Sequence, residues 1–221
     1  AFVKAGFLGF AGSGKTTTAS MLAIGIAKRL ADGKPVAFID TETGSDFLIP
    51  KFDAEGIGLL TVKTSAFPDL LAAGKEAESG CSVLIVDSIT HIWNELNEAQ
   101  LRAVNSGREK KRQAPLKKLE FQHMAEVKRT WGQWTLFFIN SKLHIIVCGR
   151  AGFEWEWEMN DETGKKELTK VGTKMKVESD FGFEPSLLVE MERVAKGAEA
   201  GAGWKHRAHI LKDRTDTING K

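Results

Sequence analysis

The sequence predicts an α/β fold: a mostly parallel sheet flanked by helices, with antiparallel strands in the C-terminal third. Over the first 150 residues, apolar segments of strand length alternate with longer segments whose apolar residues recur at helical spacing. After them come a hairpin pattern and two more strand patterns, without a helical segment between. Strand and helix in alternation are typical of a parallel sheet covered on both faces.

The parallel part is expected to contain five strands and several helices. The strands are expected at 2–10, 35–40, 56–62, 82–88 and 144–149, and the helices at 15–33, at 67–80 and between 90 and 141 with a loop near 105–115. Glycines end the first two helices, and the unbroken apolar run "VLIV" is typical of a strand buried on both faces.

The C-terminal third is expected to be antiparallel. Segment 153–159 alternates apolar and acidic residues, 160–166 is turn-like and 167–177 returns, so a hairpin is expected at about 152–178. Two further strands are expected at 186–194 and 204–213. A length of 221 residues suits one domain with a sizeable core, and we expect 1–221 to form a single domain carrying the inserted hairpin.

Composition does not indicate a partner, because the net charge is only +2. Cys81 and Cys148 lie in or beside apolar runs without metal-ligand spacing, which favours buried free thiols over a disulfide or metal site and suggests a reducing, cytoplasmic setting. No signal peptide opens the chain, and polar residues at 140–142 interrupt its longest apolar segment. We therefore expect no membrane association.

The segment "GFAGSGKT" fits the phosphate-binding pattern G-x-x-x-x-G-K-[ST] between a strand and a helix. Its glycines would let backbone N–H groups wrap a phosphate, and the helix N-terminus would add its positive end. Lys15 would reach the β- and γ-phosphates of ATP and Thr16 would bind Mg²⁺; a glycine-rich turn without a ligand is the alternative. The expected nucleotide-binding residues are Gly9, Phe10, Ala11, Gly12, Ser13, Gly14, Lys15, Thr16 and Thr17.

Two carboxylates at the carboxyl ends of strands complete the expected site. Asp87 ends an apolar strand and is expected to serve Mg²⁺, with a helix N-cap as the alternative. Hydrolysis also needs a carboxylate near the γ-phosphate to position a water. Ser88 follows Asp87, so this base must come from a neighbouring strand end, and Glu42 of "VAFIDTETG" is the candidate. Asp40 is expected to support the loop or the surroundings of the magnesium.

Together these motifs resemble the RecA-like ATPases. "FIDTET" is similar to that family's "FIDAEH"-like motif, which implies that Glu42 is the catalytic glutamate, and "VDS" matches its magnesium strand. Arg150, at the end of "HIIVCGR", stands where the family has a γ-phosphate sensor, commonly Gln or Asn. "ILKDR" resembles the "KNR"-type motif of RadA-like proteins, which implies that Lys212 and Arg214 reach the ATP of an adjacent subunit; a solvated basic end is the alternative.

The overall pattern resembles phage-encoded AAA-type NTPases with a RecA-like core, among them compact single-strand annealing proteins. "GFEPSLLVEMER" and the terminal "KDR" carry this resemblance. It implies a homo-oligomer with ATP at subunit boundaries, as a ring or a partner-driven assembly, in the host cytoplasm. It also implies a role in recombination, repair or replication, with single-stranded DNA and a single-strand-binding protein as partners.

Two segments are candidates for contact with nucleic acid. Residues 102–129 contain nine basic and three acidic residues, and the expected DNA contacts are Arg108, Lys110, Lys111, Arg112, Lys117 and Lys118. A solvated helical face is the alternative. In the predicted hairpin, Trp155 and Trp157 share one strand face and could stack on bases. Packing of these rings on the core or on a neighbouring subunit is the alternative there.

The function expected from these motifs is Mg²⁺-dependent ATP hydrolysis coupled to DNA binding, most readily to single strands. One alternative is a P-loop small-molecule kinase, although the sequence has no clear arginine-rich lid. Another is a nucleotide-dependent switch or motor without direct DNA contact. A GTPase is disfavoured because the guanine-reading NKxD motif is absent.

Overall fold

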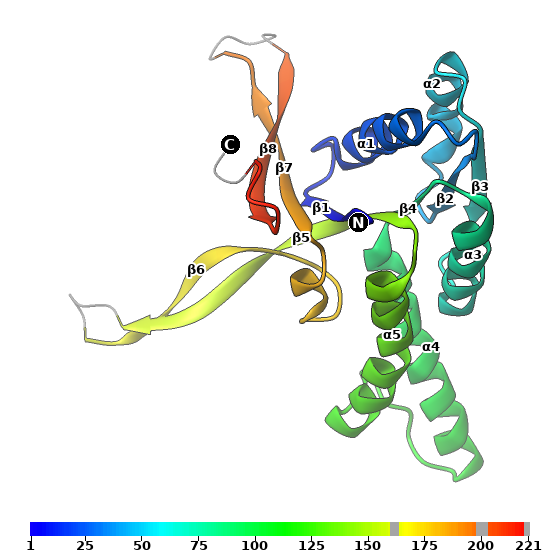
Figure 1. Cartoon of the computed structure of the whole chain (residues 1–221). Helices are drawn as coiled ribbons and strands as arrows, with labels where there is room; N and C mark the ends of the chain where they lie inside the picture. The colour runs from blue at the N-terminus through cyan, green and yellow to red at the C-terminus, as the bar shows by residue number, and fades with distance from the viewer. Residues whose placement is uncertain (160–163, 198–202, 219–221) are drawn as a thin grey trace.

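A single sheet organises the computed structural model, which describes residues 1–159, 164–197 and 203–218 (Figure 1). Within these residues the strand order is β3-β2-β4-β5-β1-β7-β8, and β6 pairs with β5. The strands are β1 (Lys4–Gly9), β2 (Val36–Asp40), β3 (Leu59–Lys63), β4 (Val83–Asp87), β5 (His144–Met159), β6 (Lys166–Met175), β7 (Leu187–Ala195) and β8 (Trp204–Asp213). The helices are α1 (Lys15–Leu30), α2 (Ile49–Ala54), α3 (Phe67–Gly80), α4 (Ile89–Lys110) and α5 (Phe121–Asn140), with short 3₁₀ turns η1 (Ser45–Phe47) and η2 (Phe181–Phe183).

The pairing of the strands confirms the predicted fold class. Neighbours from β3 to β7 along the sheet are parallel. The β5–β6 and β7–β8 pairs are antiparallel. All carboxyl ends of the parallel strands therefore meet at one edge of the sheet, where ligands of open α/β sheets bind.

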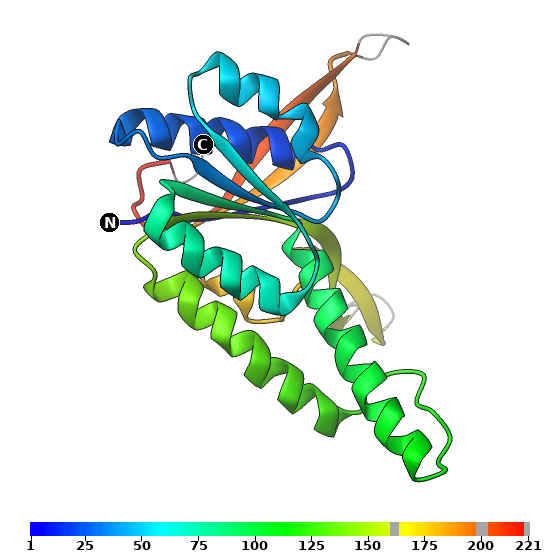
Figure 2. The same cartoon turned by 90° about the vertical axis from the view of Figure 1, so that its right-hand side faces the viewer.

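The core lies on both faces of this sheet, because successive side chains of each central strand point in opposite directions. On one face, side chains such as Leu84, Val86, Ile145 and Val147 pack with α3, α4 and α5. On the other, side chains such as Val83, Ile85, Ile146 and Cys148 pack with α1 and α2. Figure 2 shows the resulting three layers. Burial on both faces explains the unbroken apolar runs in the sequence.

Two elements extend further than the sequence pattern predicts. β5 does not end near Arg150 but continues to Met159, because β6 supplies a new hydrogen-bonding partner from Ala151 onwards. α4 continues to Lys110 through a segment expected to be loop. Its last turn is rich in Arg, Glu and Lys, which are good helix formers. The connection to α5 therefore covers only residues 111–120.

Both cysteines are free and buried, as predicted. Burial raises the pKa of the Cys148 thiol well above its ordinary value, so this group is a core residue and not a reactive thiolate. Among the helices that the structure describes, none has the length and apolar character that crossing a bilayer requires.

Candidate functional site

The loop between β1 and α1 forms a cradle that needs glycine at two points. A Cβ on Gly9 would lie 2.4 Å from the Met191 carbonyl oxygen of neighbouring β7, too close for any side chain. Gly14 has φ +91°, a left-handed conformation that glycine adopts without strain. The motif glycines therefore give the loop its shape, as expected of a P-loop.

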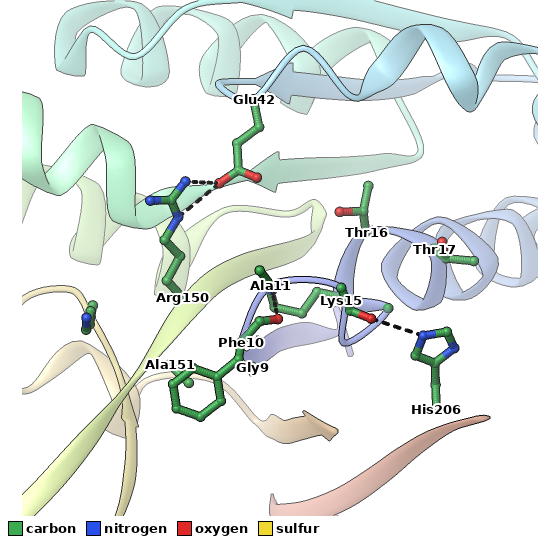
Figure 3. Close-up of a pocket in the computed structure, with 13 residues that line it drawn as sticks. Gly9, Phe10, Ala11, Lys15, Thr16, Thr17, Glu42, Arg150, Ala151 and His206 are labelled. Atoms are coloured by element: carbon green, nitrogen blue, oxygen red, sulfur yellow. Dashed lines mark hydrogen bonds and ion pairs between the residues drawn. The ribbon is translucent and has the colours of Figure 1, made fainter. Parts of the chain in front are cut away.

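This cradle opens into a cavity of about 690 Å³ at the carboxyl edge of the sheet (Figure 3). Its lining is Gly9, Phe10, Ala11, Gly12, Gly14, Lys15, Thr16, Thr17, Glu42, Arg150, Ala151, Lys176 and His206. Eight of the nine predicted nucleotide-binding residues are in this set. The ninth, Ser13, has a buried side chain packed against Gly9, and its N–H donates to the Phe10 carbonyl at 3.2 Å.

Two kinds of hydrogen-bond donor at the cradle, the Lys15 ammonium and the backbone N–H groups of the first turn of α1, are available to an anion. Among the residues that the structure describes, Lys15 Nζ donates only to the Phe10 carbonyl, at 3.1 Å. In the described residues α1 begins without a side-chain cap, so N–H groups of its first turn are available to an anion. The cradle therefore fits the triphosphate of a nucleotide.

Thr16 and Asp87 bring two oxygen ligands together beside this cradle. The Thr16 hydroxyl donates a short hydrogen bond to Asp87 Oδ2. Burial raises the pKa of Asp87, although the hydrogen bond from Thr16 opposes this effect. Hydroxyl and carboxylate oxygens suit Mg²⁺, which usually takes one or two protein ligands and completes its shell with phosphate and water. The pair fits that ion.

Asp40 caps the loop after β2. Its buried carboxylate accepts hydrogen bonds from the N–H groups of Glu42 at 2.9 Å, Gly44 at 3.2 Å and Ser45 at 2.8 Å. Burial alone would raise the pKa of Asp40, but these hydrogen bonds outweigh it and hold the pKa below its ordinary value of 3.8. The charged carboxylate thus fixes the turn that presents Glu42, which agrees with its expected supporting role.

Glu42 reaches the cavity from the turn after β2 and meets the Arg150 guanidinium there (Figure 3). Its Oε1 accepts hydrogen bonds from Arg150 Nη2 at 3.1 Å and Nε at 3.3 Å. His91 Nε2 lies 3.5 Å from the same oxygen, and His91 Nδ1 lies 2.8 Å from Thr41 Oγ1. The predicted base and the predicted phosphate sensor therefore form an ion pair, oriented by a histidine.

The comparisons with known proteins agree with this geometry. Residues 1–210 match the AAA domain family. The chain belongs to this family. Its fold is also similar to that of a KaiC-like protein from the hyperthermophilic archaeon Pyrococcus horikoshii OT3, with a TM-score of 0.51 and 17% identity over 95% of this chain and 78% of that one. That likeness concerns the fold and supports its RecA-like form. No curated protein matches the chain.

Three residues at the site of this AAA domain have no motif that would have revealed them. His91 lies in the first turn of α4, four residues after Asp87. His206 arrives from β8, with Nε2 3.1 Å from the Gly12 carbonyl oxygen. Lys176 follows β6 and lines the cavity. The last two are distant in sequence, and only the register of the C-terminal strands places them here.

Lys212 and Arg214 lie away from the cavity of their own AAA domain. Both side chains donate to the Phe183 carbonyl, Arg214 Nη2 at 3.1 Å. Asp213, between them, pairs with Leu187 at the first residue of β7. The P-loop begins beside Met191, further along the same strand. Neither side chain lines the P-loop cavity of its own chain.

The two candidate DNA-contact regions project from different places on the AAA domain (Figure 1). The basic residues sit at the far end of the α4–α5 pair, about 30 Å from the cavity given the rise along α4. There Arg108 Nε donates to the Ala114 carbonyl at 2.7 Å, which ties the connecting loop to α4. The β5–β6 hairpin extends elsewhere and leaves Trp155 and Trp157 52% and 67% exposed, not packed on the core of this chain.

Proposed function

We propose that this protein is a Mg²⁺-dependent ATPase whose turnover is coupled to binding of single-stranded DNA. The observation that carries the ATPase part is the meeting of the P-loop cradle, the Thr16–Asp87 pair and Glu42 around one cavity. Membership of the AAA domain family supports nucleotide binding and hydrolysis. In this proposal, residues 1–221 act as one ATPase domain.

Each residue of the site has a distinct part in the proposed reaction. Lys15 exchanges the Phe10 carbonyl for phosphate oxygens. Thr16 and Asp87 would hold the magnesium, which would neutralise charge on the phosphates. Glu42 first separates from Arg150 and then accepts a proton from the attacking water. Once Arg150 has separated from Glu42, its guanidinium contacts the terminal phosphate. The ion pair seen here is then the resting arrangement of both groups.

The exposed face of the β5–β6 hairpin supports the DNA part. Cross-strand partners share a face, so Trp155 lies beside Lys170, and Met159 beside Lys166. This surface, which we call the aromatic face, consists of Phe153, Trp155, Trp157, Met159, Lys166, Leu168 and Lys170. Glu154, Glu156 and Glu158 alternate with the aromatic residues along β5 and point to the opposite face.

Aromatic rings interleaved with cations suit single-stranded DNA, because bases stack on the rings and lysines meet the phosphates. Lys170 Nζ lies 3.9 Å from the centroid of the Phe153 ring. The row also reaches the ATP site, since the Phe153 ring centroid is 5.2 Å from that of Phe10 in the P-loop. Occupation of the cradle and of the aromatic face would therefore affect one another.

The basic tip of the α4–α5 pair would add a second, electrostatic contact. Its proposed DNA-binding residues are Arg108, Lys110, Lys111, Arg112, Lys117 and Lys118. This contact would steer phosphates to the domain and weaken steeply with salt. The resemblance to phage ATPases supports a role in phage recombination, repair or replication in the host cytoplasm, beside a single-strand-binding protein.

The test of this function is the ATPase rate with and without single-stranded DNA. We expect DNA to stimulate turnover, and Trp155→Ala with Trp157→Ala to reduce DNA affinity by about 1–3 kcal/mol for each stacked base lost. Glu156→Gln, on the opposite face of the same strand, is the matched control and should keep the stimulation. A rate that DNA leaves unchanged would refute the coupling, and turnover on a nucleoside or sugar instead would point to a kinase.

We also propose that the chain assembles into a homo-oligomer with ATP at subunit boundaries. Lys212 and Arg214 are two cations remote from their own cavity, which suits a role toward a neighbour's nucleotide.

Mixing two inactive variants tests for shared sites. Lys15→Ala subunits lack a working cradle, and Arg214→Ala subunits lack the cation offered to a neighbour. We expect the mixture to hydrolyse ATP faster than the two variants measured separately, because mixed boundaries restore complete sites. Activity no greater than the average of the separate variants would show that the sites are not shared.

A further inference from the structure

The two strands of the β5–β6 hairpin leave the core side by side, and at this base of the hairpin each has a cationic side chain that lines the P-loop cavity. Arg150 lies on β5, where it pairs with Gly9 at the start of the P-loop. Lys176 follows the last residue of β6. The Lys176 N–H donates to the Arg150 carbonyl at 2.8 Å, so the two segments are hydrogen-bonded to each other at the cavity wall.

The side chain of Lys176 crosses the neighbouring strand at a glycine. A Cβ on Gly152 would lie 2.7 Å from Lys176 Cε and 3.0 Å from its Cγ. The lysine stem therefore runs in the space that the missing side chain leaves, and a larger residue at position 152 would displace it. Gly152 gives Lys176 its path over β5.

Lys176 differs from the other cations of the cavity in its partners. Lys15 Nζ bonds to a carbonyl of the P-loop and Arg150 bonds to Glu42. In the part of the chain that the structure describes, no hydrogen bond or ion pair engages Lys176 Nζ. A lysine that lines this cavity and has no anionic partner among the described residues is the cation with most to gain when a phosphate enters.

We propose that Lys176 binds the terminal phosphate of ATP within its own subunit and, with Arg150, distinguishes ATP from ADP. The assignment rests on the proposed function, because it requires that the cavity hold ATP. Glu42 marks the γ-phosphate end of the cavity; Arg150 contacts Glu42, and Lys176 is joined to Arg150. These contacts hold the Lys176 backbone beside Arg150 at the cavity wall, and under the proposed function this wall is the end where ATP and ADP differ.

Equilibrium binding of a non-hydrolysable ATP analogue and of ADP to the full chain tests the assignment. We expect Lys176→Ala to weaken binding of the analogue by about 10- to 100-fold, the worth of a hydrogen bond to a charged group, and to change ADP binding less than about twofold. Lys176→Arg should restore most of the preference for the analogue. Lys174→Ala, a lysine of β6 paired with Glu154, is the control and should bind both nucleotides as the wild type does.

The outcomes separate this assignment from the function on which it rests. Equal weakening of the analogue and ADP, or no weakening of either, would overturn the role of Lys176 while leaving the ATP site intact. A wild-type chain that binds neither nucleotide would overturn the proposed function, and the assignment with it. A Gly152→Val variant, expected to displace the lysine stem, should reproduce the selective loss of analogue binding.

Discussion

Glu42→Gln is expected to lower ATP turnover by about 10²- to 10⁴-fold, the usual contribution of a positioned general base. The amide cannot accept the proton of the attacking water, although it keeps the size of the carboxylate. Affinity for ATP should not weaken, because the change also releases Arg150, which Glu42 now holds through two hydrogen bonds. Steady-state turnover and nucleotide binding, measured on the same preparation, separate these effects.

A carboxylate outside the site provides the control for this change. Glu55 forms an exposed ion pair with Lys28 and does not line the cavity, so Glu55→Gln should leave turnover unaltered. If Glu42→Gln retains turnover within about threefold of the wild type, the base lies elsewhere. If it loses ATP binding as well, the residue has a part in holding the nucleotide that the geometry does not indicate.

Trp131→Ala is expected to lower the free energy of unfolding by about 3–5 kcal/mol, as for other buried large aromatic residues. The side chain is 1% exposed, and its ring centroid lies 5.2 Å from that of Trp93, 5.7 Å from Phe181 and 6.0 Å from Phe67. These rings join α3, α4, α5 and the turn after β6. The truncation would leave a cavity where they meet.

Denaturant unfolding of this variant can be compared with that of Phe121→Ala. Phe121 lies on the same helix but is 95% exposed, so its truncation should change stability by no more than about 0.5 kcal/mol. Similar values for the two variants would contradict the packing seen around Trp131.

The parts of the site that could be predicted from the sequence depend on short contiguous motifs or on the ends of single strands. Gly9 to Thr16 is a contiguous motif, and its glycines indicate a phosphate-binding loop. Asp87 and Glu42 follow strands whose carboxyl ends must meet in a parallel sheet, so their proximity could be predicted from the strand pattern alone.

The parts that sequence reasoning missed depend on register between distant segments. Lys176 and His206 reach the cavity only because β6 and β8 pair as they do, and a shift of one residue would turn each side chain to the other face. Arg150 was expected at the end of a strand, since nothing local indicates that β6 prolongs the ladder. The extent of α4 was missed for a different reason. The residues "NSG" suggested a loop, but the helix formers beside them continue the helix to Lys110.

β5 gives the domain an unusual mechanical property. One unbroken backbone of 16 residues, about 50 Å long, begins in the middle of the core and ends at the outer hairpin. It has no loop between those parts, and Met175 packs closely over Gly149. A load applied at the outer end of β5 is therefore carried by the strand that pairs with β1 and β4. Under the proposed function, tension on a DNA strand bound to the hairpin would therefore reach the P-loop cavity as strain in the sheet.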